Sequence, residues 1–174
     1  MWGLLVFLVT AVSSGEVADS TESGFTSRNS IQVSAGPNAV YNALVNDVHE
    51  WWDSDHTYTG DSANLSIEPE AGGCFCERLS DERKGGSVQH MEVVYAEPDR
   101  SLRMRGGLGP LQAMGVAGAM TFGLEASGDG TEITLTYVVG GYAPGEGGLG
   151  ALAGAVDGVV RGQLESLARY VDEP

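Results

Sequence analysis

Basic residues are scarce in this chain. Its 174 residues include only nine Lys and Arg against 24 Asp and Glu, and the formal net charge is -15. A surface of this sign repels the phosphates of nucleic acids and of anionic lipids. The composition therefore disfavours nucleic acid and anionic membrane surfaces as partners, and it predicts a partner that is neutral or cationic.

Long apolar runs are also missing. The uncharged apolar run at residues 3–12 is far shorter than the roughly 20 residues that a spanning helix needs. The small residues Ser13, Ser14 and Gly15 follow it, as at a signal peptidase site. We therefore expect a signal peptide at residues 1–15, a periplasmic or secreted location, and no integral membrane span after processing. Retention of the segment as an amino-terminal anchor is the alternative.

The remaining chain has the composition of one folded domain. Hydrophobic residues make up 42% and charged residues 19% of the sequence, which excludes a wholly disordered chain. Residues 16–29 are mostly polar, and we expect them to form a disordered leader. The folded domain is expected at residues 30–174.

Periodicity divides that domain into strands and helices. Residues 30–34 alternate apolar and polar side chains, and a short amphipathic helix follows Pro37. Residues 149–171 carry one continuous apolar stripe, which indicates a long helix packed on a large surface. The pattern predicts an α+β domain whose sheet wraps the last helix and leaves an apolar pocket beneath it. Further strands are expected at residues 64–68, 74–79, 87–97, 101–106, 120–127 and 131–140.

The order of these elements resembles that of the START-like helix-grip superfamily, also called SRPBCC. The likeness covers residues 30–170, and it is to the branch that groups polyketide cyclase/dehydrase and lipid-transport proteins with relatives of the heat-shock ATPase activator. The motifs that carry it are residues 31–37 (IQVSAGP) ahead of Val40 and Tyr41, the pair Trp51 and Trp52, residues 72–75 (GGCF), and Pro98 ahead of Leu102.

This resemblance implies a helix-grip fold, in which a curved antiparallel sheet of about seven strands wraps the long C-terminal helix around a hydrophobic cavity. It does not fix the function, because superfamily members bind lipids, sterols or polyketides, catalyse cyclisation, or act on proteins. No catalytic residue set is common to them, so none is carried over. The activator function would need a cytosolic partner, which the predicted signal peptide contradicts.

A polar and aromatic segment, residues 49–61, is the first candidate site. Adjacent Trp side chains cannot both face one way, so we expect one of Trp51 and Trp52 to pack in the core and the other to line the pocket mouth. His56 beside Asp55 is a weak candidate for a general base, since a carboxylate can orient an imidazole. The alternative is that both Trp side chains are packing residues and the acidic residues are solvated.

A glycine-rich segment, residues 106–115, is expected to be a mobile flap over an apolar ligand, with a plain packed loop as the alternative. It joins the aromatic segment and the inner face of the strands in lining the pocket. The residues expected to contact the ligand are Trp51, Trp52, Tyr58, Phe75, Met91, Leu108, Leu111, Met114 and Tyr142.

Cys74 and Cys76 share one face of a predicted strand, with Cα atoms about 6.6 Å apart. A disulfide would be strained at that spacing, so we expect free thiols. A symmetric hairpin would place Cys76 opposite His90 and Cys74 opposite Glu92, a weak candidate set for Zn or Cu. The favoured interpretation is two small packed thiols without a metal; a redox pair and a metal site are the alternatives.

Three functional hypotheses follow from these features. The leading one is an exported START-like protein that binds a small hydrophobic or amphipathic ligand between the sheet and the last helix. The second is a cyclase- or dehydratase-type enzyme that uses the same cavity, and the third is a redox or metal-handling protein that uses the Cys-Phe-Cys strand. Whether the protein is an enzyme is left open, and no cofactor is expected.

Overall fold

The computed structural model describes residues 14–173. Eight strands form a single antiparallel sheet with the order β1-β2-β8-β7-β6-β5-β4-β3. Every strand except β1 and β3 therefore has a partner on both sides. The strands are β1 (Ser14–Thr21), β2 (Gly24–Val33), β3 (Leu65–Ile67), β4 (Cys74–Arg78), β5 (Ser87–Glu97), β6 (Ser101–Arg105), β7 (Gly115–Ser127) and β8 (Gly130–Tyr142).

Three helices cover one face of this sheet. Pro37 occupies the first turn of α1, where its missing N–H costs nothing. Among residues 14–173, no helix combines the length and the hydropathy needed to cross a bilayer. The helices are α1 (Pro37–Asn46), α2 (Val48–Trp51) and α3 (Ala153–Asp172), and the 3-10 turns are η1 (Ser54–His56), η2 (Ser62–Asn64), η3 (Asp81–Arg83), η4 (Gly109–Ala113) and η5 (Gly148–Leu152).

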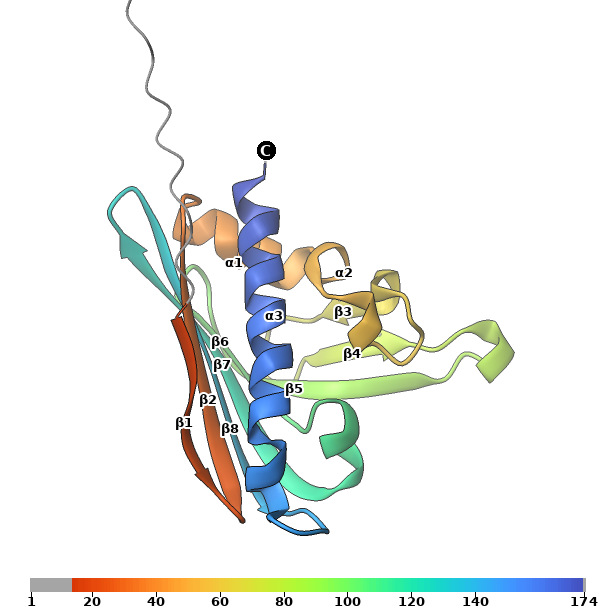
Figure 1. Ribbon diagram of the computed structural model, residues 1–174. Coiled ribbons are helices and arrows are strands. Elements are labelled where there is room, and N and C mark those ends of the chain that lie inside the picture. Colours follow the sequence, from red (N-terminus) through yellow and green to blue (C-terminus); the bar gives the residue numbers. More distant parts are fainter. Residues whose placement is uncertain (1–13, 174) are drawn as a thin grey trace, which may run out of the picture.

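The C-terminal helix α3 crosses the concave face of the sheet and packs most extensively on β2 (Figure 1). Its side chains Leu164 and Leu167 are fully buried, as are Ile133 and Leu135 of β8. The expected α+β helix-grip fold is confirmed. The sheet has eight strands rather than about seven, because residues 14–21 add the edge strand β1.

The expectation of a disordered leader at residues 16–29 is wrong. These residues form β1 and the first part of β2, and the inward positions of β2 begin at Phe25. Two of those inward positions are the polar residues Ser27 and Asn29, which are buried because both donate hydrogen bonds to Asp157 of α3. Because these inward residues are polar, the sequence does not show the alternation of apolar and polar residues that indicates a half-buried strand.

The predicted signal peptide stays a prediction. Residues 1–13 lie outside the described part of the chain. The boundary expected near Gly15 falls within β1, which begins at Ser14.

Candidate functional site

A cavity of about 590 Å³ lies beside α3 and is bounded by residues 52–58, the segment around η4 and, from the sheet, His90. This volume is within the range of about 300–1,000 Å³ that is typical of small-molecule sites. Its wall is mostly apolar and includes Leu108, Leu111 and Met114 from the segment around η4, and Val156 and Val160 from α3. The cavity therefore suits a molecule that is largely apolar.

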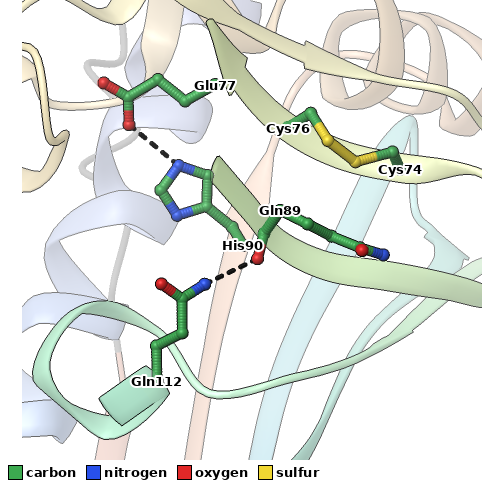
Figure 2. Close-up of a disulfide and its surroundings, with 6 residues drawn as sticks. All are labelled: Cys74, Cys76, Glu77, Gln89, His90 and Gln112. Atoms are coloured by element: carbon green, nitrogen blue, oxygen red, sulfur yellow. Dashed lines mark hydrogen bonds and ion pairs between the residues drawn. A yellow bond between two sulfur atoms is a disulfide. The ribbon is translucent and has the colours of Figure 1, made fainter. Parts of the chain in front are cut away.

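One buried polar pair reaches this wall. His90 of β5 lines the cavity with only 5% of its side chain exposed, and its Nε2 lies 3.0 Å from Oε2 of Glu77. Glu77 of β4 is fully buried and also accepts hydrogen bonds from the backbone N–H groups of Tyr58, at 2.9 Å, and Thr59, at 2.6 Å. Figure 2 shows the imidazole between the Glu77 carboxylate and Gln112.

The surroundings fix the charge of both groups. Burial lowers the pKa of His90, and the hydrogen bond and the charge of Glu77 offset only part of this effect. Burial alone would raise the pKa of Glu77, but the hydrogen bonds from Tyr58, Thr59 and His90 outweigh it, so this pKa lies below its ordinary value. At neutral pH the pair is therefore a carboxylate beside a neutral imidazole.

A β-bulge brings His90 to the inner face of the sheet. Cys74 pairs with Glu92 as expected, and Phe75 pairs with Met91, but Cys76 pairs with Gln89. His90 is therefore the extra residue of β5, and it is turned inward beside Met91. The expected position of His90 opposite Cys76 is wrong, because a symmetric hairpin has no such extra residue.

The two cysteines form a disulfide, so the expectation of free thiols is wrong. Their Cα atoms are 5.3 Å apart rather than the 6.6 Å of a regular strand, because the ladder is irregular between Phe75 and Cys76. Among residues 14–173, no group of three or more His, Cys, Asp or Glu side chains is arranged to hold a metal. His90 and the cysteines lie on opposite faces of the sheet, which removes the geometric basis of the metal site.

The aromatic segment after α2 contributes the mouth of the cavity. Trp52 lines the cavity, whereas Trp51 packs in the core with its ring edge on Phe122. His56 and Asp55 both line the cavity, but they do not form the expected pair: Nε2 of His56 lies 4.0 Å from Oδ2 of Asp53. Both partners of that contact are solvent-exposed, so water screens the interaction between them.

Four other expected ligand contacts line the cavity, and three do not. Tyr58, Leu108, Leu111 and Met114 belong to the wall. Phe75 and Met91 face inward but are 1% exposed, packed beneath the wall rather than on it. Tyr142 is 72% exposed at the end of β8, where it borders a different hollow, so its expected ligand contact is wrong.

Hydrogen bonds hold the glycine-rich segment in place. Tyr137 donates from its hydroxyl to the carbonyl of Gly106 and accepts from the N–H of Leu108, and burial raises the pKa of Tyr137 to about 12. Gln112 donates to the carbonyl of Gln89 at 2.6 Å and accepts from the Tyr58 hydroxyl. The segment is therefore tied to β5, β8 and the aromatic mouth.

Glu77 is the site residue that sequence reasoning missed. Its signal was available: Glu77 stands two residues after Phe75, so strand alternation places it on the same buried face. A carboxylate predicted on an apolar face requires partners, and the neighbouring strand supplies His90.

A family model described as polyketide cyclase / dehydrase and lipid transport matches residues 25–172. The chain belongs to this family. The resemblance to START-like proteins is therefore confirmed, and the matched region contains β2 except its first residue, strands β3 to β8 and all three helices. No curated protein sequence matches the chain. Membership of the polyketide cyclase / dehydrase and lipid transport family supports ligand binding in the cavity and names no ligand.

Solved structures share the fold of this family member at low sequence identity. A protein from Rhizobium leguminosarum is 17% identical over 94% of this chain and 99% of its own, with a TM-score of 0.62. Protein MLL2253 from Mesorhizobium loti is 20% identical over 84% of this chain and 96% of its own, with a TM-score of 0.58. The Aha1 dimer from Colwellia psychrerythraea is 16% identical over 85% of this chain and 96% of its own, with a TM-score of 0.54. These likenesses show the fold alone.

Proposed function

We propose that the protein binds a small hydrophobic or amphipathic molecule in the cavity between the sheet and α3. The observation that carries this proposal is the 590 Å³ space itself, whose wall is apolar except for the mouth and His90. Burying an apolar molecule there releases water from both surfaces, at roughly 25 cal/mol per Å². The family match supports the same conclusion.

Fluorescence of an environment-sensitive apolar dye tests this proposal. The folded protein should bind the dye, and Met114→Glu should weaken binding at least about tenfold, because it places a charge in an apolar wall. Val138→Glu makes the same change at an exposed position of β8 and is the matched control, which should bind as the native protein does. Absence of dye binding, or equal losses in both variants, would contradict the proposal.

The buried pair supports a second candidate, a cyclase- or dehydratase-type enzyme in the same cavity. Neutral His90 is placed to remove a proton next to a ligand carbonyl, with Glu77 stabilising the resulting imidazolium. The electron pair would stay on the ligand as an enolate. The test incubates an apolar ketone with the protein in heavy water. The hydrogens next to its carbonyl should exchange for deuterium faster with the native protein than with His90→Gln. Equal exchange rates would exclude this candidate for the ketone tested.

We also propose that the protein is exported. The apolar run at residues 3–12 supports this, and so does the Cys74–Cys76 disulfide, since disulfides persist mainly in oxidising compartments. Cell fractionation with intact-mass measurement should find a shortened chain outside the cytoplasm. Full-length protein confined to the soluble cytoplasm would contradict export without affecting the cavity.

A further inference from the structure

The hydrogen bonds around Glu77 decide which nitrogen of His90 carries the proton. An ionised carboxylate only accepts hydrogen bonds, so Nε2 of His90, 3.0 Å away, must donate. In the neutral imidazole, Nδ1 then carries a lone pair and no hydrogen. Because the N–H groups of Tyr58 and Thr59 also donate to Glu77, the carboxylate is held in place and cannot turn away from the ring.

Nδ1 is the ring nitrogen of His90 that Glu77 leaves free to accept a hydrogen bond. The ring lines the cavity, and Figure 2 shows its second nitrogen on the side turned away from Glu77. Within residues 14–173, no protein group donates a hydrogen bond to this atom. An acceptor that faces an apolar space gains free energy from any donor that the ligand supplies.

The rest of the wall disfavours an anionic head group. No Lys or Arg is among the described residues that line the cavity, and the charged lining residue Asp55 is negative and exposed. A carboxylate or phosphate would lose its water without meeting a cation. Its oxygens would also face the lone pair of Nδ1 rather than a donor.

An ammonium head group fits poorly as well. It carries three N–H donors, whereas His90, the buried polar residue of the wall, offers one acceptor, Nδ1. Glu77 does not line the cavity and is fully buried, so its charge makes no direct contact with a ligand. A hydroxyl group is uncharged and has one O–H donor, which matches the one acceptor atom that His90 supplies.

We infer that the preferred ligand is a neutral apolar molecule with one hydroxyl group, an alcohol or a phenol, whose O–H donates to Nδ1 of His90. This inference rests on the proposed binding function and adds the chemical class of the ligand. His90 is the contact residue, and Glu77 is a positioning residue that acts through it.

A matched set of ligands tests the inference by isothermal titration calorimetry at neutral pH. The set is para-octylphenol, its methyl ether, para-octylbenzoate and para-octylbenzylamine, which share one apolar tail and differ in the head group. The phenol should bind about 5- to 10-fold more tightly than the ether, the effect of one net hydrogen bond. It should also bind more tightly than either charged compound.

Two variants locate the effect. His90→Phe keeps a ring in the wall and removes the acceptor, so the phenol and the ether should bind with a ratio near one. His49→Phe makes the same substitution outside the cavity wall and should keep the native ratio. If His90→Phe does not fold, the nitrogen-15 NMR shift of Nδ1 in the native protein gives the same information, because the phenol should move it and the ether should not.

The outcomes separate the two claims. Equal affinity for phenol and ether, tighter binding of the acid or the amine, or an unchanged ratio in His90→Phe would overturn the hydroxyl inference while leaving the binding function in place. Failure of every compound to bind would overturn the binding function itself. A phenol preference that His90→Phe abolishes and His49→Phe retains would establish the inference.

Discussion

Glu77 links the chemistry of the cavity to its shape. Its two oxygens accept one hydrogen bond from His90 and two from the backbone at Tyr58 and Thr59, so one buried carboxylate holds both the imidazole and the loop at the mouth. Removing it would leave one buried and two part-buried donors without an acceptor, which costs more than the loss of a single hydrogen bond. The residue therefore joins the loop at the mouth to the imidazole that lines the cavity.

This pair should make the protein sensitive to acid. The unfolded chain takes up a proton at His90 as pH falls through its ordinary pKa of 6.5, whereas the folded protein resists because burial lowers that pKa. The folded pKa of Glu77 is also lowered, so a second loss follows as pH falls below its ordinary 4.5. In both windows the unfolded state binds more protons, and the free energy of unfolding should fall with pH.

Urea unfolding at a series of pH values measures this effect. The decline should begin near pH 6.5 in the native protein. His90→Gln should remove the first part of the decline, whereas His49→Gln, at an exposed position, should keep it. If the free energy of unfolding of the native protein instead rose as the pH was lowered from neutral to about 5, the assigned direction of the pKa shifts would be contradicted.

Gly118 is needed for the close packing behind the glycine-rich segment. A Cβ at this position would lie 2.6 Å from both the carbonyl oxygen of Gly106 and the ring of Tyr137. Gly118→Ala should therefore lower the free energy of unfolding by about 1–3 kcal/mol and disturb the segment that Tyr137 anchors.

Gly123→Ala, in the same strand, is the matched control. Its Cβ would meet only the carbonyl of Thr134, at an ordinary 3.9 Å. The difference between the two variants in urea unfolding isolates the steric cost. Equal stabilities would show that the contact at Gly118 relaxes freely.

At the level of elements, the β4–β5 hairpin sets the inner face of the site. The bulge turns His90 inward, and the Cys74–Cys76 disulfide lies on the other strand beside the same irregularity. A second bulge follows at Val94, which leaves Tyr95 exposed, with the guanidinium of Arg103 over its ring, rather than in the core where regular alternation would place it. Two bulges in one strand thus decide which side chains of β5 face inward, and the first of them brings His90 to the cavity.

Replacing both cysteines with serine should have a modest effect on stability. The disulfide closes a loop of only three residues, so its removal should cost roughly 1–2 kcal/mol. Ligand selection should also change. Strand β4, which pairs with β5 beside His90, loses the disulfide that constrains it, so the preference for para-octylphenol over its ether should decrease. Calorimetry on the double variant and on native protein with the disulfide reduced should agree; an unchanged preference in both would show that the bulge holds without the disulfide.

Across the whole molecule, polar contacts align α3 on β2. Asp157 accepts from Ser27 at 2.7 Å and from Asn29 at 3.0 Å within the core, and Asp172 accepts from the backbone and the hydroxyl of Ser34 at the end of the strand. These contacts join segments about 130 residues apart in sequence. They fix the helix that forms one wall of the cavity.

Asp157→Ala should destabilise the protein by about 2–4 kcal/mol, because it removes two buried hydrogen bonds and leaves the Ser27 hydroxyl without its acceptor. Asp157→Asn keeps one acceptor oxygen and should cost less. Asp172→Ala removes the same number of hydrogen bonds at an exposed site, and its cost should be below about 1 kcal/mol. Urea unfolding compares the three variants, and similar losses for Asp157→Ala and Asp172→Ala would contradict the role of burial.

Much of the architecture could be predicted from the sequence. The apolar stripe of the last helix and the alternation in Ile31, Val33 and later strands identified the α+β class, and the motif order indicated the family. The site was harder to predict. The exposed pair His56 and Asp55 stood out because its members are adjacent, whereas Glu77 and His90 are separated by 13 positions and meet only through strand pairing.

Local patterns in the sequence determined the helices, most strands and the apolar character of the cavity, because periodic burial leaves its mark on neighbouring residues. Tertiary structure alone decided the features that depend on distant partners. Ser27 and Asn29 are buried because Asp157 meets them across the core, and His90 faces the cavity because a one-residue bulge reverses its direction. A register shift of one residue moves a side chain to the opposite face, and hydrogen bonds between strands fix that register.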